Sequence, residues 1–536
     1  MRERCGSGSG SGGYASGMID GDHAPDTAAD TAPDADPDLA PAHRGIPLPD
    51  EVNAWVATQR WFVGKGQLPA LRSIGHFFLA SNAPGVTVRV DLALDTASRG
   101  CTLYQLPTTE RIAELPDASA ALITVREPGT DHARFIYDGP HDPAFAAAVL
   151  VFMETRGVTS TSTAPVTDRC VASAHGEDLQ PGPVTPATMP LPTSRVTASR
   201  VLSGEQSNTS IIVQRTDATG ASTMPIICKV FRVIHSGENP DVTVQAALAG
   251  AGSDRIPLPY GAISGQWDDP AEPGNRAVGH LAFAQEFLPD APDAWRTALV
   301  AAAAGTDFTQ PAYRLGQVTA EVHRDLACTL PTLEATPEAV AREMAKMRQR
   351  SNQALSEVPG LARHRDAIEA IFSRAETTAW PRLQRIHGDF HLGQVLDVPG
   401  RGWVLLDFEG EPLRSLRERT EPDVPLRDVA GMLRSFSYVA GAMTATAGSA
   451  AAGSFTDILP DIFDWAMACR GAFLTGYAER SGITLADQSP LLDAFELDKA
   501  LYEAVYEIRN RPAWLPIPLA AIERLVGVAG RPASTG

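Results

Sequence analysis

The stretch RIHGDFHLGQVL, which runs from Arg385 to Leu396, decides how the rest of the chain is interpreted. It places Asp389 five residues before Gln394, and a second stretch, LLDFEGEP, follows at Leu405–Pro412. A carboxylate, an amide five positions later and another acid after a short hairpin are typical of the catalytic loop and metal-binding turn of phosphotransferases. The pattern therefore predicts a centre that transfers a phosphoryl group.

The requirements of phosphoryl transfer suggest a role for each acid and for the amide in these two stretches. Phosphoryl transfer requires cations that neutralise crowded negative charge and a base that aligns the attacking hydroxyl. Asp389 is the candidate base. Gln394 and Asp407 are candidate ligands of Mg²⁺, and Glu409 is a further candidate ligand. Magnesium is the expected metal because it prefers hard oxygen donors.

Three histidines need separate interpretations. His387 and His391 flank Asp389 and are candidate substrate contacts. The same residues read HxDxH, so a transition-metal site is an alternative, although no motif for a third ligand is evident. His323, in the segment EVHRDLA, is interpreted as an ordinary residue of a helix surface or core.

Length and composition limit what kind of protein the chain can be. Its 536 residues exceed one hydrophobic core and predict two or three domains. The hydrophobic content is 44% and the charged content 20%, as in globular proteins, and no apolar stretch reaches the ~18 to 20 residues of a membrane span. Since no signal-peptide core is evident near the start either, we expect a cytoplasmic protein.

Charge and cysteine usage agree with that expectation. A net charge of −19 argues against nucleic acid and anionic membranes as partners, because both favour a basic face. We therefore expect a monomer that acts on a small molecule. The six cysteines form no CxxC pair, so they predict neither a zinc site nor a disulfide framework. Cys228 lies in an apolar run and is expected in the core.

The chain is expected to be an α+β protein with a bilobal, kinase-like arrangement, because segments with strand character precede segments with helical periodicity. Its residues divide into a disordered acidic and Gly/Ser-rich tail at 1–45, an α+β subdomain at 46–156, a linker or long loop at 157–193, an N-lobe rich in strands at 194–290, and a mainly helical C-lobe at 291–536.

A hairpin and a charged strand are the expected phosphate contacts of the N-lobe. Two strands flank the segment SGEQSN, whose small polar residues Ser207 and Asn208 are candidate nucleotide contacts. Lys229 lies within the apolar strand PIICKVFRV, where an unpaired lysine is costly to bury, so it is expected to meet an anion. An ordinary hairpin and an edge-strand lysine that reaches solvent remain the alternatives.

The next helix and strand complete the expected nucleotide site. The helix predicted at Asn239–Ala249 should carry the acid that pairs with Lys229, and Asn239 or Asp241 is its expected cap. The following strand is interpreted as a hinge whose backbone meets adenine, with an ordinary buried strand as the alternative. Its candidate contacts are Gln285, Glu286, Phe287 and Leu288.

Residues near the end of the C-lobe are candidates for sugar recognition. They offer aromatic faces and carboxylates at i, i+4 spacing on a predicted helix. A packed, salt-bridged helix end is the alternative interpretation. The candidates are Tyr502, Glu503, Tyr506, Glu507, Arg509 and Trp514.

The chain resembles the actinobacterial maltokinases, which are related to the aminoglycoside phosphotransferases. The matching stretches are QRWFVGKG, LSGEQSNTS, GENPDV, IHGDFHLGQVL, LLDFEGEP, PLRDVAGMLRSF and YEAVYEIRNRPAWLPIPLAAI. They span about residues 48 to 530. The resemblance implies a kinase-like fold with an N-terminal cap, which would be the subdomain at 46–156. It also implies transfer of phosphate from ATP to the anomeric hydroxyl of maltose, which gives maltose 1-phosphate for α-glucan and glycogen synthesis.

Carried over by motif, the resemblance implies that Asp389 is the base, that Gln394 and Asp407 bind the metal, and that Lys229 binds phosphate. One departure concerns Thr243, because the family pattern often has an acid at this position. Asp241 is then the substitute partner of Lys229.

Two other functions remain open from the sequence. A kinase of another sugar, or of an amino sugar such as glucosamine, would use the same centre, since an acidic pocket suits an ammonium group. A nucleotide-binding protein without catalytic activity is the alternative that Thr243 raises.

Overall fold

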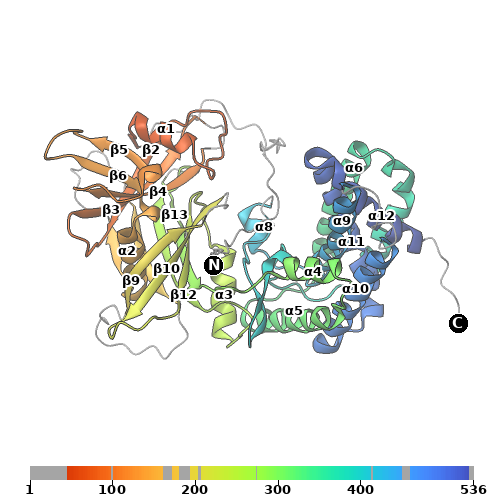
Figure 1. Ribbon diagram of the computed structural model, residues 1–536. Helices are drawn as coiled ribbons and strands as arrows, with labels where there is room; N and C mark the ends of the chain where they lie inside the picture. The colour runs from red at the N-terminus through yellow and green to blue at the C-terminus, as the bar shows by residue number, and fades with distance from the viewer. Residues whose placement is uncertain are drawn as a thin grey trace, which may run out of the picture. The chain divides into compact units, whose positions relative to one another are not determined.

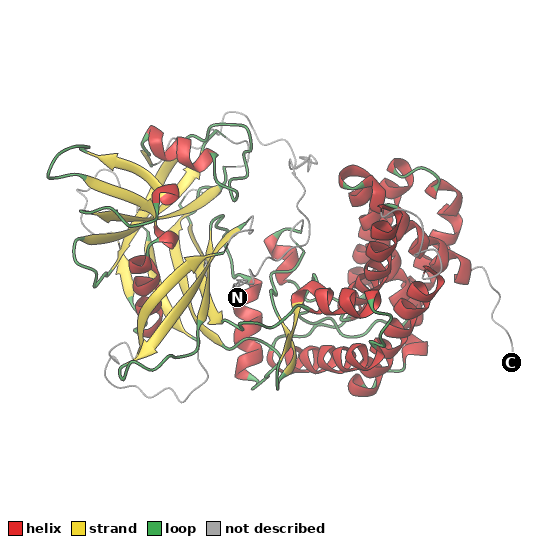
Figure 2. Cartoon of the chain, viewed as in Figure 1, coloured by secondary structure: helices red, strands yellow, loops and turns green. Residues whose placement is uncertain are grey.

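The structure consists of two compact units, the first rich in strands and the second mainly helical (Figures 1 and 2). Unit 1 contains the chain up to Glu238 and the segment Leu258–Asp290, and unit 2 contains Asn239–Pro257 and the chain from Ala291. The computed structural model describes residues 45–97, 101–160, 172–179, 194–202, 207–272, 274–411, 414–449 and 459–529. The expected tail at 1–45 lies outside these residues except for its last position.

The first sheet of unit 1 is built from the predicted N-terminal subdomain. It has six antiparallel strands in the order β1-β2-β3-β4-β6-β5. The residues after α1 (Asp50–Ala57) pack Trp61 and Phe62 against Tyr104 of β4, which closes a small apolar core. The strands are β1 (Ile46–Pro47), β2 (Leu71–Leu79), β3 (Val86–Asp95), β4 (Leu103–Arg111), β5 (Leu122–Arg126) and β6 (Arg134–Asp138).

The second sheet of unit 1 has seven antiparallel strands in the order β7-β8-β12-β13-β11-β10-β9. Lys229 lies in β11, between β13 and β10, so the alternative of an edge-strand lysine is wrong. The strands are β7 (Val158–Ser160), β8 (Ser173–Asp178), β9 (Ser194–Val201), β10 (Asn208–Asp217), β11 (Ile226–Phe231), β12 (Pro259–Asp268) and β13 (Arg276–Glu286).

The segment at 157–193 differs from the predicted linker or long loop. Its described residues form β7 and β8, and β8 pairs with β12 over six positions, from Ser173 opposite Gln266 to Asp178 opposite Gly261. Polar composition predicted a loop, but hydrogen bonds to a neighbouring strand can stabilise a strand whose own propensity is low. The segment therefore contributes to the sheet.

Helix α2 (Pro143–Glu154) joins the two sheets of unit 1 through one hydrophobic core. Asp142 caps the helix by accepting the N–H of Ala144, and Pro143 occupies the first helical position, where no donor is lost. Its buried Phe145 and Val149 pack in the core that also contains Val230 of β11. The predicted core position of Cys228 is confirmed, since its side chain is buried in the same cluster.

Unit 2 is mainly helical, as predicted for the C-lobe, and includes one two-stranded hairpin. Helix α3 belongs to this unit, although the sequence analysis assigned its residues to the N-lobe at 194–290. Within the described residues, no helix is both long and apolar enough to cross a membrane. The elements are α3 (Pro240–Gly250), α4 (Ala294–Ala303), α5 (Thr309–Thr329), α6 (Pro337–Glu357), α7 (Arg365–Thr377), β14 (Val395–Val398), β15 (Gly402–Leu405), α8 (Leu416–Thr420), α9 (Leu426–Ser449), α10 (Leu459–Ser481), α11 (Leu485–Asn510) and α12 (Pro516–Ala529).

Two glycines allow α5 and α10 to pack closely. A Cβ added at Gly316 of α5 would meet the backbone of Phe473 and the nitrogen of Tyr477 in α10. A Cβ added at Gly476 of α10 would meet the backbone of Tyr313 in α5. Because α5 carries His323, this close packing also fixes the helix that reaches the candidate site described below.

We predict that Gly316→Ala lowers the free energy of unfolding by about 1–3 kcal/mol, because the added methyl group forces the helices apart. The matched control is Gly471→Ala in the partner helix α10, where an added Cβ meets nothing within 4 Å. That control should be neutral or stabilising by about 0.5–1 kcal/mol, since alanine favours helix. Urea denaturation followed by circular dichroism measures both effects, and equal stability of the two variants would contradict the packing role.

Candidate active site

A hairpin places the predicted amide and acid side by side. The turn Leu392–Gln394 leads into β14, which pairs with β15, and the N–H of Leu406 donates to the carbonyl of Gln394 at 2.9 Å. At this point the Gln394 amide donates to Asp407 Oδ2 at 3.2 Å. The φ of Asp407 is 62°, which is unfavourable for a residue with a Cβ, so surrounding contacts must hold it there.

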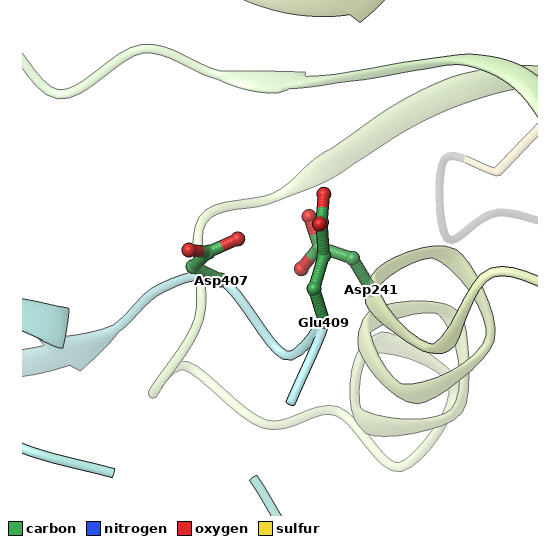
Figure 3. Close-up of side chains that lie close together, drawn as sticks. All are labelled: Asp241, Asp407 and Glu409. Carbon is green, nitrogen blue, oxygen red and sulfur yellow. The ribbon is translucent and has the colours of Figure 1, made fainter. Parts of the chain in front are cut away.

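Three carboxylates meet beside that hairpin. Atoms of Asp241, Asp407 and Glu409 all lie within 4.8 Å of one another, and Figure 3 shows Asp241 on its helix with the other two on one loop. Asp241 is buried in the first turn of α3 and accepts the N–H of Phe408 at 2.8 Å and an amide N–H of Gln245 at 2.7 Å. The helix therefore holds the loop between the two other acids.

This donor set fits magnesium. Carboxylate and amide oxygens are hard donors, and Mg²⁺ is commonly bound through one or two carboxylates together with substrate phosphates. Among the described residues, the group of side chains able to hold a metal contains neither His387 nor His391. The contacts of these histidines, given below, also leave the HxDxH alternative without support.

Asp428, at the start of α9, anchors the loop that carries the candidate base. Its Oδ1 accepts the N–H of Gly388 at 2.9 Å, and its Oδ2 accepts the N–H of His387 at 2.8 Å. His323 of α5 contacts the same Oδ2 through Nε2 at 3.1 Å and contacts the hydroxyl of Tyr477 through Nδ1 at 3.0 Å. Because Asp428 is only 2% exposed, water does not compete for these bonds.

Asp389 follows Gly388, whose φ of 85° favours glycine and turns the chain. The Asp389 carboxylate lies 3.6 Å from the ammonium of Lys499 in α11, and the same ammonium donates to Glu411 at 3.1 Å. Burial opposes the charge of Lys499, but Glu411 and Asp389 outweigh burial and raise its pKa above the usual range. The candidate base therefore lies beside a permanently charged cation.

Glu411 is the counter-ion that keeps this cation in place. Burial would raise the pKa of Glu411, but the charges of Lys499 and Arg414 outweigh burial and lower it to about 2. Because the pKa in the folded state lies below the ordinary value of 4.5, this interaction stabilises the fold above about pH 4.5. Its contribution is lost as the pH falls towards 2.

The two histidines that flank Asp389 form hydrogen bonds with backbone groups. His387 is 2% exposed; its Nε2 donates to the carbonyl of Leu406 at 2.8 Å, and its ring packs between Phe390 and Phe408. The prediction that His387 contacts substrate is therefore wrong in this structure, because its ring faces the protein interior. His391 is half-buried and its Nδ1 accepts the N–H of Gly393 at 3.0 Å; its contact with substrate stays a prediction.

Two of the predicted sugar contacts carry buried ion pairs instead. Glu503 accepts from Arg434 of α9 at 2.8 Å, and burial raises the pKa of Glu503 although Arg434 opposes it. Glu507 accepts from Arg511 at 2.6 Å and from the hydroxyl of Tyr438 at 3.0 Å. For these two residues, the salt-bridged helix end is the better interpretation.

The other candidates divide between two surroundings. Arg509 is exposed and pairs with Glu357 of α6 at 2.8 Å, and its contact with sugar stays a prediction. Tyr502 lies under the ammonium of Lys499, with 5.2 Å between the nitrogen and the ring centre, and so belongs to the surroundings of the candidate base. Tyr506 and Trp514 pack against the guanidinium of Arg511, and their contact with sugar stays a prediction.

The predicted nucleotide contacts all belong to unit 1. Asn208 begins β10, while the turn before Ser207 lies outside the described residues. The N–H groups of Glu286 and Phe287 donate to the carbonyls of Leu258 and Pro225, at 2.8 and 2.9 Å.

These two N–H groups are bonded to neighbouring strands and loops of unit 1. The adenine contact of this segment stays a prediction. Gln285 is 5% exposed, in accord with the alternative of an ordinary buried strand. Asn239 caps α3 as expected, by accepting the N–H of Asp241 at 2.9 Å.

The sequence analysis missed the residues that hold the site together. Lys499 and Glu411 lie beside the candidate base Asp389, and Asp428 holds its loop. The position of Lys499, three and four residues before Tyr502 and Glu503, places it on the same helix face and was an available signal. Asp428 gives no such signal, because its partners are backbone groups 40 and 41 residues away.

We predict that Asp428→Asn lowers the free energy of unfolding by about 3 kcal/mol, because an amide N–H then faces a buried N–H of the loop. The rate of phosphoryl transfer should fall with it, because Asp389 stands on the displaced loop. Tyr477→Phe is the graded control: it removes only the outermost bond of the network and should cost about 1 kcal/mol. Urea denaturation and a rate assay measure the two effects; equal losses in both variants would contradict the anchoring role.

Comparisons with known proteins identify relatives of this chain. The model of the maltokinase N-terminal cap domain matches residues 55–142. A glucosamine kinase of Mycolicibacterium smegmatis is 30% identical over 342 residues, which cover 61% of this chain and 79% of the relative. A glucosamine kinase of Streptacidiphilus jiangxiensis is 29% identical over 343 residues, which cover 60% of this chain and 72% of the relative.

A solved structure shows the same fold. A glucosamine kinase in complex with glucosamine, ADP and inorganic phosphate superposes with a TM-score of 0.59, at 20% identity, and covers 88% of this chain and 98% of its own. The expected α+β, kinase-like fold with an N-terminal cap is thereby confirmed. By its cap and its curated relatives, the chain belongs to the maltokinase family and is a sugar kinase.

Proposed function

We propose that the protein transfers the γ-phosphoryl group of ATP to the anomeric hydroxyl of maltose and so produces maltose 1-phosphate for α-glucan and glycogen synthesis. The observation that carries the choice of a neutral sugar is the half-buried cation Lys499, 3.6 Å from the candidate base Asp389. The cap match supports the maltokinase assignment.

Asp389 is the proposed base. Its loop is fixed by Asp428 through two backbone N–H groups, and a base held in one position can align an acceptor hydroxyl and accept its proton. The ammonium of Lys499 lies 3.6 Å from the Asp389 carboxylate and compensates part of its charge.

Gln394, Asp407 and Glu409 are the proposed magnesium ligands, with Asp241 beside them. When bound, the metal neutralises charge on the phosphate oxygens. The protein's own contribution is to hold three carboxylates together, and it does so through the bond from Phe408 N–H to Asp241.

For the nucleotide, we propose Lys229 as the residue that binds phosphate, with Ser207 and Asn208 at the start of β10. Lys229 and Asn208 project from the same face of neighbouring strands, because Asn208 pairs with Phe231, two residues beyond Lys229. The pairing of Lys229 with Asp241 stays a prediction.

The charges around the base favour a neutral acceptor. Glu411, Glu503 and Glu507 each pair with a cation of the protein, at 3.1, 2.7 and 2.6 Å. A substrate ammonium group would therefore meet Lys499 rather than an uncompensated carboxylate, and like charges at short range repel. Tyr502, under the same ammonium, offers an aromatic face for a sugar ring.

Phosphorylation of glucosamine is the second candidate function. It is favoured by the names of the relatives at 30% and 29% identity, both of which are glucosamine kinases. The two functions differ in the acceptor alone, so one measurement separates them.

We predict that ADP is released in the presence of ATP, Mg²⁺ and maltose, with much less release for glucose, trehalose and glucosamine. Transfer to the anomeric hydroxyl also removes the reducing end of maltose, so a reducing-sugar assay should lose its signal as ADP accumulates. The Asp389→Asn control should lower the rate by about 10²–10⁴-fold, because a general base contributes that much. Activity with glucosamine and none with maltose would establish the second candidate, while no release with any sugar would leave only nucleotide binding.

We predict that Lys499→Met lowers kcat/KM for maltose by about 10–100-fold, because the substitution keeps the buried stem but removes the cation beside Asp389. The ratio of glucosamine to maltose activity should rise, since the charge that repels an ammonium group is gone. The control is Lys346→Met, whose exposed pair with Glu418 should matter little. An unchanged ratio, measured at a pH where glucosamine is protonated, would refute the assignment of Lys499.

A further inference from the structure

The strands that carry the proposed phosphate contacts have two distinct faces. In the β10–β11 pair, Ser210 lies opposite Lys229 and Thr209 lies opposite Val230. Opposite residues share a face and successive residues alternate, so Thr209 and Val230 lie on the face turned away from Lys229. Arg232 follows the last residue of β11, and its side chain reaches Thr209 on that second face.

Arg232 joins this second face to the cap. Its side chain is 0% exposed, and Nη2 donates to both carboxylate oxygens of Asp138 at 2.8 Å. Its Nε donates to the hydroxyl of Thr209 at 2.8 Å, and its guanidinium lies 4.9 Å from the ring centre of Trp61. Trp61 and Asp138 both fall within the segment that matches the cap model, so one guanidinium connects the cap with both strands.

Asp138 is an anion in the folded protein. Burial favours its neutral form, but Arg232 and His141 outweigh burial and keep the pKa of Asp138 below its usual range. His141 contacts the carboxylate at 3.1 Å and is itself partly exposed. The ion pair of Asp138 and Arg232 is therefore charged on both sides at neutral pH.

The backbone around Arg232 is attached to the cap as well. The N–H of Gln105 in β4 donates to the carbonyl of Arg232, and the N–H of Ile234 donates to the carbonyl of Leu103, both at 2.8 Å. The Gln105 amide also donates to the carbonyl of Phe231 at 3.3 Å. The end of the strand that carries Lys229 is thus bonded to β4 on both sides of Arg232.

A role in stability alone does not account for the buried pair. Replacing a buried ion pair with apolar residues of similar volume is often neutral or stabilising, because both charges must be desolvated. One guanidinium nitrogen of Arg232, Nη1, is buried and has no hydrogen-bond partner among the described residues, which adds to that cost. The planar guanidinium of Arg232 fixes the geometry between Asp138 and Thr209, because its N–H groups point in set directions. An apolar pair cannot do this.

We propose that Arg232 and Asp138 are positioning residues through which the cap sets the nucleotide-binding face of β10 and β11. The guanidinium fixes Thr209 from the cap side, and the alternation of the strands then fixes Asn208 and Lys229 on the opposite face. This inference rests on the proposed ATP site, and it assigns to the cap the task of keeping that site in register.

The test separates nucleotide affinity from stability. We expect the double variant Arg232→Met with Asp138→Leu to stay as stable as the natural protein, while its Kd for ATP rises about tenfold. Thr209→Val, which removes only the hydroxyl, should raise the Kd for ATP by a smaller factor with an unchanged Tm. Calorimetric titration with ATP and Mg²⁺ measures the affinity without any sugar, and thermal unfolding measures the stability.

The matched control is Arg215→Met on β10, six residues beyond Thr209. Arg215 is also buried, donates to the hydroxyl of Tyr260 at 2.6 Å and pairs with Glu154 at 3.5 Å. It should change stability but not the Kd for ATP. If the double variant and Thr209→Val are stable and bind ATP normally, the inference is overturned.

The outcomes also separate the inference from the proposed function. Normal ATP binding by the natural protein without turnover of maltose overturns only the proposed acceptor. Absence of ATP binding in the natural protein overturns both the ATP site and the role of the cap. If the double variant unfolds, Arg232→Lys takes its place: it keeps the charge but cannot bridge Asp138 and Thr209, so the Kd for ATP should still rise, and an unchanged Kd refutes the inference.

Discussion

The buried carboxylate of Asp428 is the interaction on which unit 2 depends. It accepts two successive backbone N–H groups of the loop that carries Asp389, and it accepts them in a place that water does not reach. A buried acceptor left unpaired, or replaced by a donor, costs far more than a surface hydrogen bond contributes. The loop is therefore fixed to α9, and through His323 to α5, before any substrate is present.

The same requirement that buried charges be paired governs the surroundings of the proposed base, Asp389. Lys499 lies between Glu411 and Asp389, and Glu503 lies against Arg434. Helix α11 is rich in acidic residues, but these ion pairs compensate the charges of its acidic side chains near Asp389. An acidic composition is therefore a poor guide to the charge that a substrate meets, because the counter-ions come from other elements.

Unit 1 shows that the cap is part of the architecture of the N-lobe. The cap sheet, α2 and the sheet that carries Lys229 share one hydrophobic core, and the ion pair of Asp138 with Arg232 lies at the boundary of the two sheets. The cap is therefore continuous with the strands of the proposed nucleotide site. A cap that was merely attached would share neither a core nor a buried charge pair with them.

The sequence by itself determined the elements and the order of the chemistry, because periodicity, turns and the HGDxxxxQ and DFE spacings are local properties of the chain. It predicted the strands around Lys229, the long helices and the neighbouring positions of Gln394 and Asp407. It did not predict that 157–193 contains strands, that Asp241 reaches Phe408, or that Asp428 and Lys499 support the proposed base. Only the tertiary structure decided these points, because each depends on partners that are distant in sequence and that pair buried charges or backbone groups.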